Sequence, residues 1–195
     1  MAVSTTCQIY NATNKDEILQ GDIFRNISYI YKTKESDDYV DITEFQFPYI
    51  IVLSQSCDIS AMSKMIENGG KIVKFMPSVL VAPIYEKESL KTGEVLKEIV
   101  ENMDFTIQKD NFYTSKEMSV IDKDYHARFH LLKFDNNPLP FDDAIIDFKH
   151  YFTISAEYLH AVRDHRVCHL EQLFCEQITL RFSNYLSRVA IPDKP

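Results

Sequence analysis

The most constraining feature of this 195-residue sequence is an apolar run that ends abruptly in a cluster of polar side chains. Every residue from Tyr49 to Leu53 is apolar or aromatic, so we expect a strand with both faces buried. Each side chain from Ser54 to Asp58 can form a hydrogen bond. A buried central strand that ends in polar side chains is a common way to place chemistry at the edge of a rigid core.

Composition and charge limit the class of protein. Hydrophobic residues make up 45% of the sequence, which is enough for a proper core. The first residues lack a signal-peptide pattern and no apolar run is long enough to cross a bilayer, so we expect a cytoplasmic protein without a membrane partner. The net charge of −8 disfavours non-specific binding to nucleic acid and favours a protein partner over RNA, which stays the other possibility.

The chain is expected to form a single domain over residues 1–195. Alternating apolar positions predict a strand-rich core over about residues 18–152, with an inserted helix at about 87–101. A C-terminal helical segment is expected at 153–192, beginning with a short helix over residues 156–162. Its best-defined helix runs from His169 to Val189, where apolar residues recur at spacings of three and four.

The cysteines do not indicate a disulfide framework or a metal site. The sequence contains no pair of cysteines separated by two residues, and we expect free thiols at Cys7, Cys57, Cys168 and Cys175. His165 and His169 lie near two of these cysteines, but helical geometry directs the four side chains apart, whereas zinc needs ligands that converge. We therefore expect no metal and no cofactor.

The polar cluster after the apolar run has two interpretations. In the first, Cys57 and Asp58 are catalytic candidates and Cys57 is the nucleophile, which requires a lowered thiol pKa and a nearby base. In the second, Cys57 is a small apolar residue at the strand end, while Asp58 bonds to amides of the turn. The second interpretation is favoured because free cysteines are commonly buried. Ser54 and Gln55 serve the turn equally well, and they are also candidate binding residues.

A second candidate site lies on the strand predicted over residues 125–134. His126, Arg128 and His130 alternate there, so they share one face and form a candidate anion or phosphate surface. The two histidines would be about 13 Å apart, at a rise of about 3.3 Å per residue, which is too far to hold one metal ion. Either histidine is also the base that a Cys57 nucleophile would need. The competing interpretation is a solvated strand face without a function.

Three motifs resemble, in order, the MazF/PemK family of toxin ribonucleases. Gly21 to Phe24 resembles the opening strand of the family, Pro48 to Ser54 its second strand, and Val79 to Ile84 its third motif. The resemblance covers about residues 20–86. It implies an α+β fold, namely an SH3-like antiparallel β-barrel with appended C-terminal helices, and it implies homodimerisation.

The same resemblance breaks at the catalytic positions. Phe47 stands where the family usually has an Arg, and Tyr85 stands where the family has a Thr. A phenyl ring cannot stabilise a charged phosphate, so the family chemistry is not expected at this position. Tyr85 remains a candidate binding residue that could stack a base.

These observations lead to two functional hypotheses. The first is a partner-regulated binding module of bacterial or phage origin, which binds a protein or RNA. The alternative is an enzyme: a metal-independent endoribonuclease that uses His126, Arg128 and His130, or, less favoured, a hydrolase that depends on Cys57.

Overall fold

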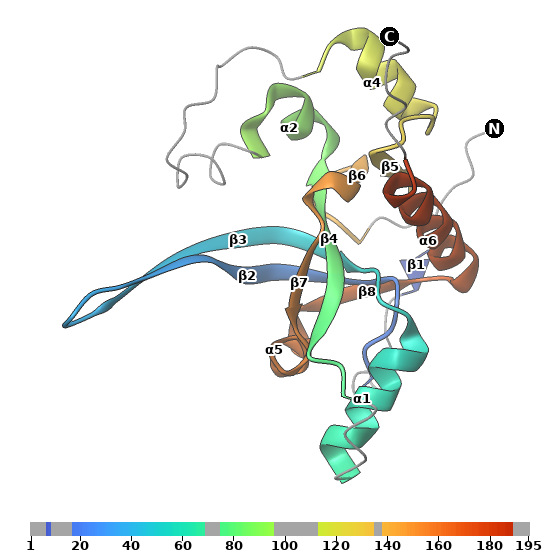
Figure 1. Ribbon diagram of the computed structural model, residues 1–195. Helices are drawn as coiled ribbons and strands as arrows, with labels where there is room; N and C mark the ends of the chain where they lie inside the picture. Colours follow the sequence, from blue (N-terminus) through green and yellow to red (C-terminus); the bar gives the residue numbers. More distant parts are fainter. Residues whose placement is uncertain (1–6, 9–16, 69–74, 96–112, 135–137, 189–195) are drawn as a thin grey trace, which may run out of the picture.

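The computed structural model describes residues 7–8, 17–68, 75–95, 113–134 and 138–188 (Figure 1). The fold is α+β, as predicted, and its sheet is antiparallel with the strand order β1-β8-β2-β3-β4-β6-β5, while β7 pairs with β4. The strands are β1 Cys7–Gln8, β2 Asp22–Glu35, β3 Val40–Val52, β4 Ser78–Glu86, β5 Phe129–Leu132, β6 Ala144–Asp147, β7 Phe152–Ser155 and β8 Arg166–Leu170. The helices are α1 Ser56–Asn68, α2 Lys87–Thr92, α4 Ser115–Asp122, α5 Ala156–Ala161 and α6 Gln172–Leu186, with 3-10 turns η3 Phe148–His150 and η4 Arg163–His165.

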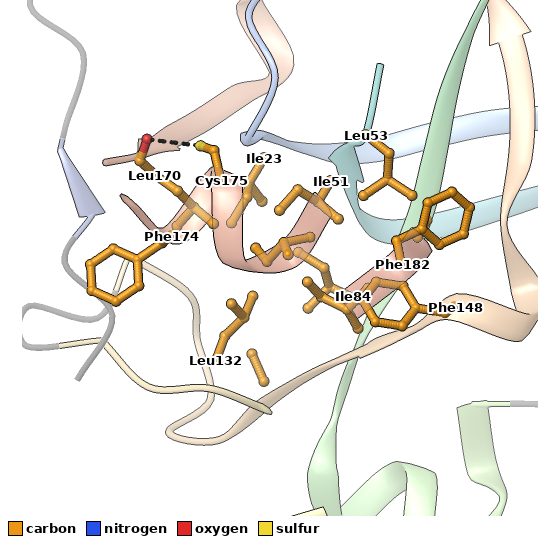
Figure 2. Close-up of a cluster of buried hydrophobic side chains, with 14 of the residues drawn as sticks. Ile23, Ile51, Leu53, Ile84, Leu132, Phe148, Leu170, Phe174, Cys175 and Phe182 are labelled. Carbon is orange, nitrogen blue, oxygen red and sulfur yellow. Dashed lines mark hydrogen bonds between the residues drawn. The ribbon is translucent and has the colours of Figure 1, made fainter. Parts of the chain in front are cut away.

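The central strand β3 is buried on both faces at its C-terminal end, which confirms the prediction from its apolar run. Ile51 points into a cluster with Ile178 and Phe182 of α6 (Figure 2). Its neighbours Ile50 and Val52 point the other way, into a cluster that includes residues of α1 and α5. Successive side chains of a strand alternate between faces, so this strand needs apolar residues at every position.

A third cluster of buried side chains lies beyond the end of β4. It joins Tyr85 and Leu90 to residues of α4, β5 and β6, among them Ile121 and Phe129. The inserted helix expected at residues 87–101 corresponds here to α2, which ends at Gly93 in the left-handed conformation typical of a helix C-terminus. Residues 96–101 lie outside the described part of the chain.

The three motifs of the family resemblance lie on neighbouring strands, but the sheet is not closed. Gly21 precedes β2, Pro48 lies in β3 and Pro83 lies in β4, and these strands pair in that order. β1 and β5 form the two ends of the strand order, and no pairing among the described strands joins them. The expected barrel closure is therefore absent from the described structure. Phe47 is buried and stacks on Phe152 with ring centroids 4.6 Å apart, so it belongs to the core.

Several predicted elements differ from the observed ones. The pattern of residues 118–121 favours a short strand, but these residues are part of helix α4, which Thr114 begins with a capping box to Glu117. The strand expected over residues 125–134 is restricted to β5, because residues 125–128, which follow a turn with a positive φ at Asp124, are not in a strand. The last helix begins at Gln172 rather than His169, since residues 166–170 pair with β2 as β8.

Strands β2 and β3 extend together far beyond the rest of the sheet (Figure 1). We call residues 28–35 and 40–47 the arm. β2 pairs with β8 only up to Phe24, and β3 pairs with β4 only from Tyr49 onward. At this boundary the register places Asn26, which has a positive φ of 53°, opposite Pro48. Asn tolerates this conformation and Pro lacks an N–H, so regular pairing is interrupted where the arm leaves the body.

Candidate active site

A buried carboxylate at the end of β6 organises the best-defined polar cluster of the described residues. Asp147 is fully buried and accepts two hydrogen bonds from Arg128, from Nε to Oδ1 at 2.7 Å and from Nη2 to Oδ2 at 2.6 Å. This two-point geometry is the strong form of an Arg–carboxylate pair. We call Tyr85, Arg128, Asp147 and His150 the Asp147 cluster.

The backbone around Asp147 explains why these groups meet. Asp147 pairs with Phe129 across β5 and β6, which places Arg128 just beyond the end of β5. The side chain of Asp147 also accepts a bond from the amide of Lys149 at 3.0 Å and so begins η3. The 3-10 turn then returns His150 to the carboxylate that started it.

The hydrogen bonds of His150 define its tautomer. Arg128 Nη2 can only donate, and it lies 3.3 Å from His150 Nε2, which therefore accepts. The ring proton is then on Nδ1, 3.0 Å from Asp147 Oδ2 and 3.1 Å from the hydroxyl of Tyr85. A carboxylate that orients a neutral imidazole in this way is a recurrent arrangement for proton transfer.

The surroundings favour the neutral form of His150 and the charged form of Arg128. Burial lowers the pKa of His150, and the positive charges of Arg128 and Lys149 lower it further, against the opposing effect of Asp147. Burial also acts to lower the pKa of Arg128, but the hydrogen bond and charge of Asp147 outweigh it and raise that pKa overall. The cluster thus combines a neutral base with a fixed guanidinium.

Tyr85 closes the buried side of the cluster. Its side chain is 3% exposed, and its ring meets the His150 ring edge to face with centroids 6.0 Å apart. Burial raises the pKa of Tyr85, and the charge of Asp147 raises it further, so the phenol stays protonated. Tyr85 therefore positions His150, whereas the base-stacking role suggested by the sequence is not available to a ring buried in this way.

The other side of the cluster is reachable by water. The side chain of His150 is 28% exposed and that of Arg128 is 18% exposed. Lys149 is exposed beside them, and Arg188 lies over the ring of Tyr185 with its central carbon 4.2 Å from the ring centroid. Tyr151 is 43% exposed. Cationic and aromatic side chains thus gather around the exposed part of the cluster.

The three residues expected on one strand face do not act together. Arg128 belongs to the Asp147 cluster. His126 precedes β5, and its Nδ1 accepts a bond from the Arg128 amide at 3.2 Å. His130 is buried in β5, where its Nδ1 lies 3.3 Å from a carboxylate oxygen of Asp124. The three side chains do not share one strand face, because the strand begins only at Phe129, after His126 and Arg128.

The residues after the apolar run serve the connection between β3 and α1. The hydroxyl of Ser54 accepts a bond from the Leu80 amide at 2.8 Å, and the carbonyl of Gln55 accepts from the amide of Asp58 at 3.2 Å. Cys57 is exposed in the first turn of α1, with its sulfur 3.7 Å from side-chain oxygens of Gln55 and Asp58. Cys57 is thus not the buried strand-end residue that the sequence favoured, and Asp58 contributes its backbone amide to the helix start.

A second buried aspartate, which sequence reasoning missed, lies at the start of β2. Asp22 Oδ2 accepts from the Leu19 amide at 2.9 Å and from Arg166 Nη1 at 3.0 Å. Asp22 Oδ1 lies 2.9 Å from Nδ1 of His169, its pairing partner on β8. We call Asp22, Arg166 and His169 the Asp22 cluster. His169 is therefore engaged by a carboxylate, and across the described residues no three metal-ligating side chains come together.

The sequence matches no protein-family model and no curated protein. Within the described residues, no helix is long and apolar enough to span a membrane. The functional assignment therefore depends on the geometry of the Asp147 cluster. In this cluster, sequence reasoning missed Asp147 and His150, although the sequence shows an acid three residues before a histidine at the end of an apolar strand.

Proposed function

We propose that this protein binds RNA at the Asp147 cluster and cleaves its phosphodiester bonds by acid–base chemistry. The observation that carries the proposal is the neutral His150, oriented by a buried carboxylate and placed 3.3 Å from a guanidinium in a water-reachable position. An imidazole that accepts a proton beside a group that binds phosphate is the combination this reaction needs.

In the proposed step, Nε2 of His150 takes the proton of a ribose 2′-hydroxyl while that oxygen attacks the adjacent phosphorus. The bond from phosphorus to the 5′-oxygen breaks, and the leaving oxygen takes a proton from water. The imidazolium then returns its proton to the resulting hydroxide. The products are a 2′,3′-cyclic phosphate and a 5′-hydroxyl. Arg128 shifts its contact from Nε2 to the phosphate oxygens, whose charge it stabilises in the transition state.

The local charge around the cluster supports an anionic substrate despite the net charge of −8. The only buried acid of the cluster, Asp147, is occupied by Arg128 and His150. Lys149 and Arg188 are exposed nearby. The charge of Lys149 acts to lower the pKa of His150, and the charge of Arg188 acts to lower the pKa of His126. Cations at this density steer a phosphate backbone to the site.

Aromatic side chains next to these cations favour single-stranded RNA. Tyr151 is exposed and packs edge to face on Phe182, with ring centroids 5.4 Å apart. The ring of Tyr185 stacks on the ring of Phe182, with ring centroids 6.5 Å apart. Exposed rings beside cationic groups bind unpaired bases by stacking, which contributes about 1–3 kcal/mol per base. The resemblance of three strand motifs to MazF/PemK ribonucleases favours the same class of substrate.

The decisive experiment compares RNA cleavage by the wild-type protein, His150→Ala and Arg128→Gln. We expect each substitution to lower the cleavage rate at least about 100-fold, the usual contribution of an acid–base group. The matched control is His165→Ala, on η4, which should keep the wild-type rate. Circular dichroism spectra establish that each variant is folded, and end-group analysis of the products tests for the 2′,3′-cyclic phosphate.

Two results would overturn the catalytic proposal. Equal cleavage by wild type and His150→Ala would mean that the activity belongs elsewhere or to a contaminant. Binding of a single-stranded oligonucleotide that Arg128→Gln abolishes, without cleavage at any protein concentration, would support the other candidate, a phosphate-binding module without catalysis.

A further inference from the structure

The arm has an exposed apolar stripe on one of its two faces. The cross-strand pairs Ile30↔Glu44, Thr33↔Ile42 and Glu35↔Val40 share this face. The side chains of Ile30, Val40 and Ile42 are 57%, 56% and 58% exposed. Three β-branched side chains in this position contribute nothing to the core of the protein, and exposed apolar surface of this kind commonly marks an interaction site.

The β3 edge of the arm is also open within the described structure. β8 leaves β2 after Phe24 and β4 reaches β3 only at Tyr49, so residues 40–47 of β3 have a strand neighbour on one side only. Long exposed edges invite pairing with another strand, and proteins usually protect them. The only proline of β3 is Pro48, at the base of the arm, where it leaves the edge of residues 40–47 unprotected.

The charges along the arm distinguish between possible occupants. Residues 28–47 contain two basic residues, Lys32 and Lys34, and five acidic residues, Glu35, Asp37, Asp38, Asp41 and Glu44. Lys34 faces Asp41 across the hairpin, whereas Glu44 faces Ile30 and Glu35 faces Val40. The β3 edge is therefore acidic. A second copy of this chain, with a net charge of −8, would be repelled.

We propose that the β3 edge of the arm captures an extended segment of a partner protein in which apolar and basic residues alternate. The segment adds as a strand beside residues 40–46, in the manner of β-augmentation. Its apolar side chains cover Val40 and Ile42, and its basic side chains lie on the opposite face, beside Asp41. This interaction is independent of the activity proposed for the Asp147 cluster.

The test uses the full chain and two fluorescently labelled octapeptides, one with alternating Lys and Val and one with alternating Glu and Val. We expect the Lys peptide to bind at least about tenfold more tightly, since opposite charges favour and like charges disfavour neighbouring strands. The double variant Asp41→Lys/Glu44→Lys should lose at least tenfold in affinity. The matched control Asp142→Lys/Asp164→Lys changes the net charge equally at exposed positions outside the arm and should keep most of the affinity.

A second pair of measurements separates strand addition from simple charge attraction. A Lys–Val peptide methylated at alternate backbone nitrogens keeps its charge but cannot form the ladder, and it should bind at least tenfold more weakly. Hydrogen exchange should slow at residues 40–46 when the unmethylated peptide binds. Equal binding of both peptides would overturn the proposal. The proposal would also be overturned if the molecular mass in solution doubled as the protein concentration rose and Ile42→Ser prevented this doubling. The arm would then bind a second copy of the chain.

Discussion

Two buried aspartates among the described residues each bind an arginine and a histidine, and their surroundings differ. In the Asp22 cluster, the side chain of Arg166 is 3% exposed, and the same carboxylate holds the amide of Leu19. In the Asp147 cluster, the side chain of Arg128 is 18% exposed and that of His150 is 28% exposed. The same three residue types therefore surround a buried arginine in one place and an arginine that is partly open to solvent in the other.

Residue types alone therefore do not identify a site. His169 is the pairing partner of Asp22 on β8, so its bond reinforces the register of the sheet. His150 lies in a 3-10 turn at the end of β6, where backbone pairing imposes no such role. A buried ion pair is costly to desolvate and strongly destabilising to break, whereas groups at a water-reachable edge retain partial solvation.

The largest expected effect is on stability, and it separates the two clusters. Asp22→Asn leaves Arg166 charged and almost fully buried, so we expect a loss of about 3–5 kcal/mol in the free energy of unfolding. Asp147→Asn leaves groups that water can reach, and we expect about 1–3 kcal/mol. Urea denaturation followed by circular dichroism measures both. Asp164→Asn, at an exposed position, should stay within about 0.5 kcal/mol. Equal losses of unfolding free energy for Asp22→Asn and Asp147→Asn would contradict the difference in solvent access between the two clusters.

An intermediate effect tests whether packing also restrains the chain beside Asp22. Gly21 has a φ of +85°, and a Cβ added there would lie 2.2 Å from the sulfur of Cys175. We expect Gly21→Ala to cost at least about 1–3 kcal/mol from backbone strain, with the steric clash in addition. Cys175→Ala should relieve the clash, so the double variant should lose less than the sum of the two single variants in urea denaturation. If the losses in the free energy of unfolding of the two single variants simply added in the double variant, a clash between the new Cβ and the Cys175 sulfur would be excluded.

The smallest effect is a pH dependence that belongs to the Asp147 cluster. Burial lowers the pKa of His150 in the folded protein, so the unfolded chain binds more protons at mildly acidic pH. The stabilisation from neutral His150 is present above about pH 6.5 and is lost as the pH falls through the lowered folded value. His150→Gln should therefore show a flatter decline in stability below about pH 6.5 than wild type in urea titrations. Parallel curves would mean that His150 does not titrate differently on folding.

Sequence reasoning predicted the parts of the fold that depend on local pattern. The uninterrupted apolar run predicted that the end of β3 is buried on both faces, and the spacing of apolar residues predicted most of α6. It failed where strand pairing or helix capping overrides the local pattern of apolar residues. Residues 166–170 form a strand because β2 offers them an edge, and Met118 lies in a helix because Thr114 and Glu117 form a capping box.

The candidate site was less accessible from sequence because its members come from distant segments. Tyr85, Arg128 and His150 meet only through the pairing of β4, β5 and β6. The sequence identified Arg128 and Tyr85 for other reasons, and it associated Arg128 with His126 and His130, which do not belong to the Asp147 cluster. Asp147 and His150 are three residues apart, but that spacing acquires a meaning only when η3 turns the imidazole back toward the carboxylate.

The position of β8 has a consequence for synthesis of the protein. β8 and α6 are made after the other described elements, yet β8 pairs with the much earlier strand β2, and α6 covers the buried face that contains Ile23 and Ile51. While the ribosome is still adding residues 166–186, that apolar face has no cover. Completion of the core must therefore wait until α6 has emerged, and until then the uncovered apolar face favours aggregation.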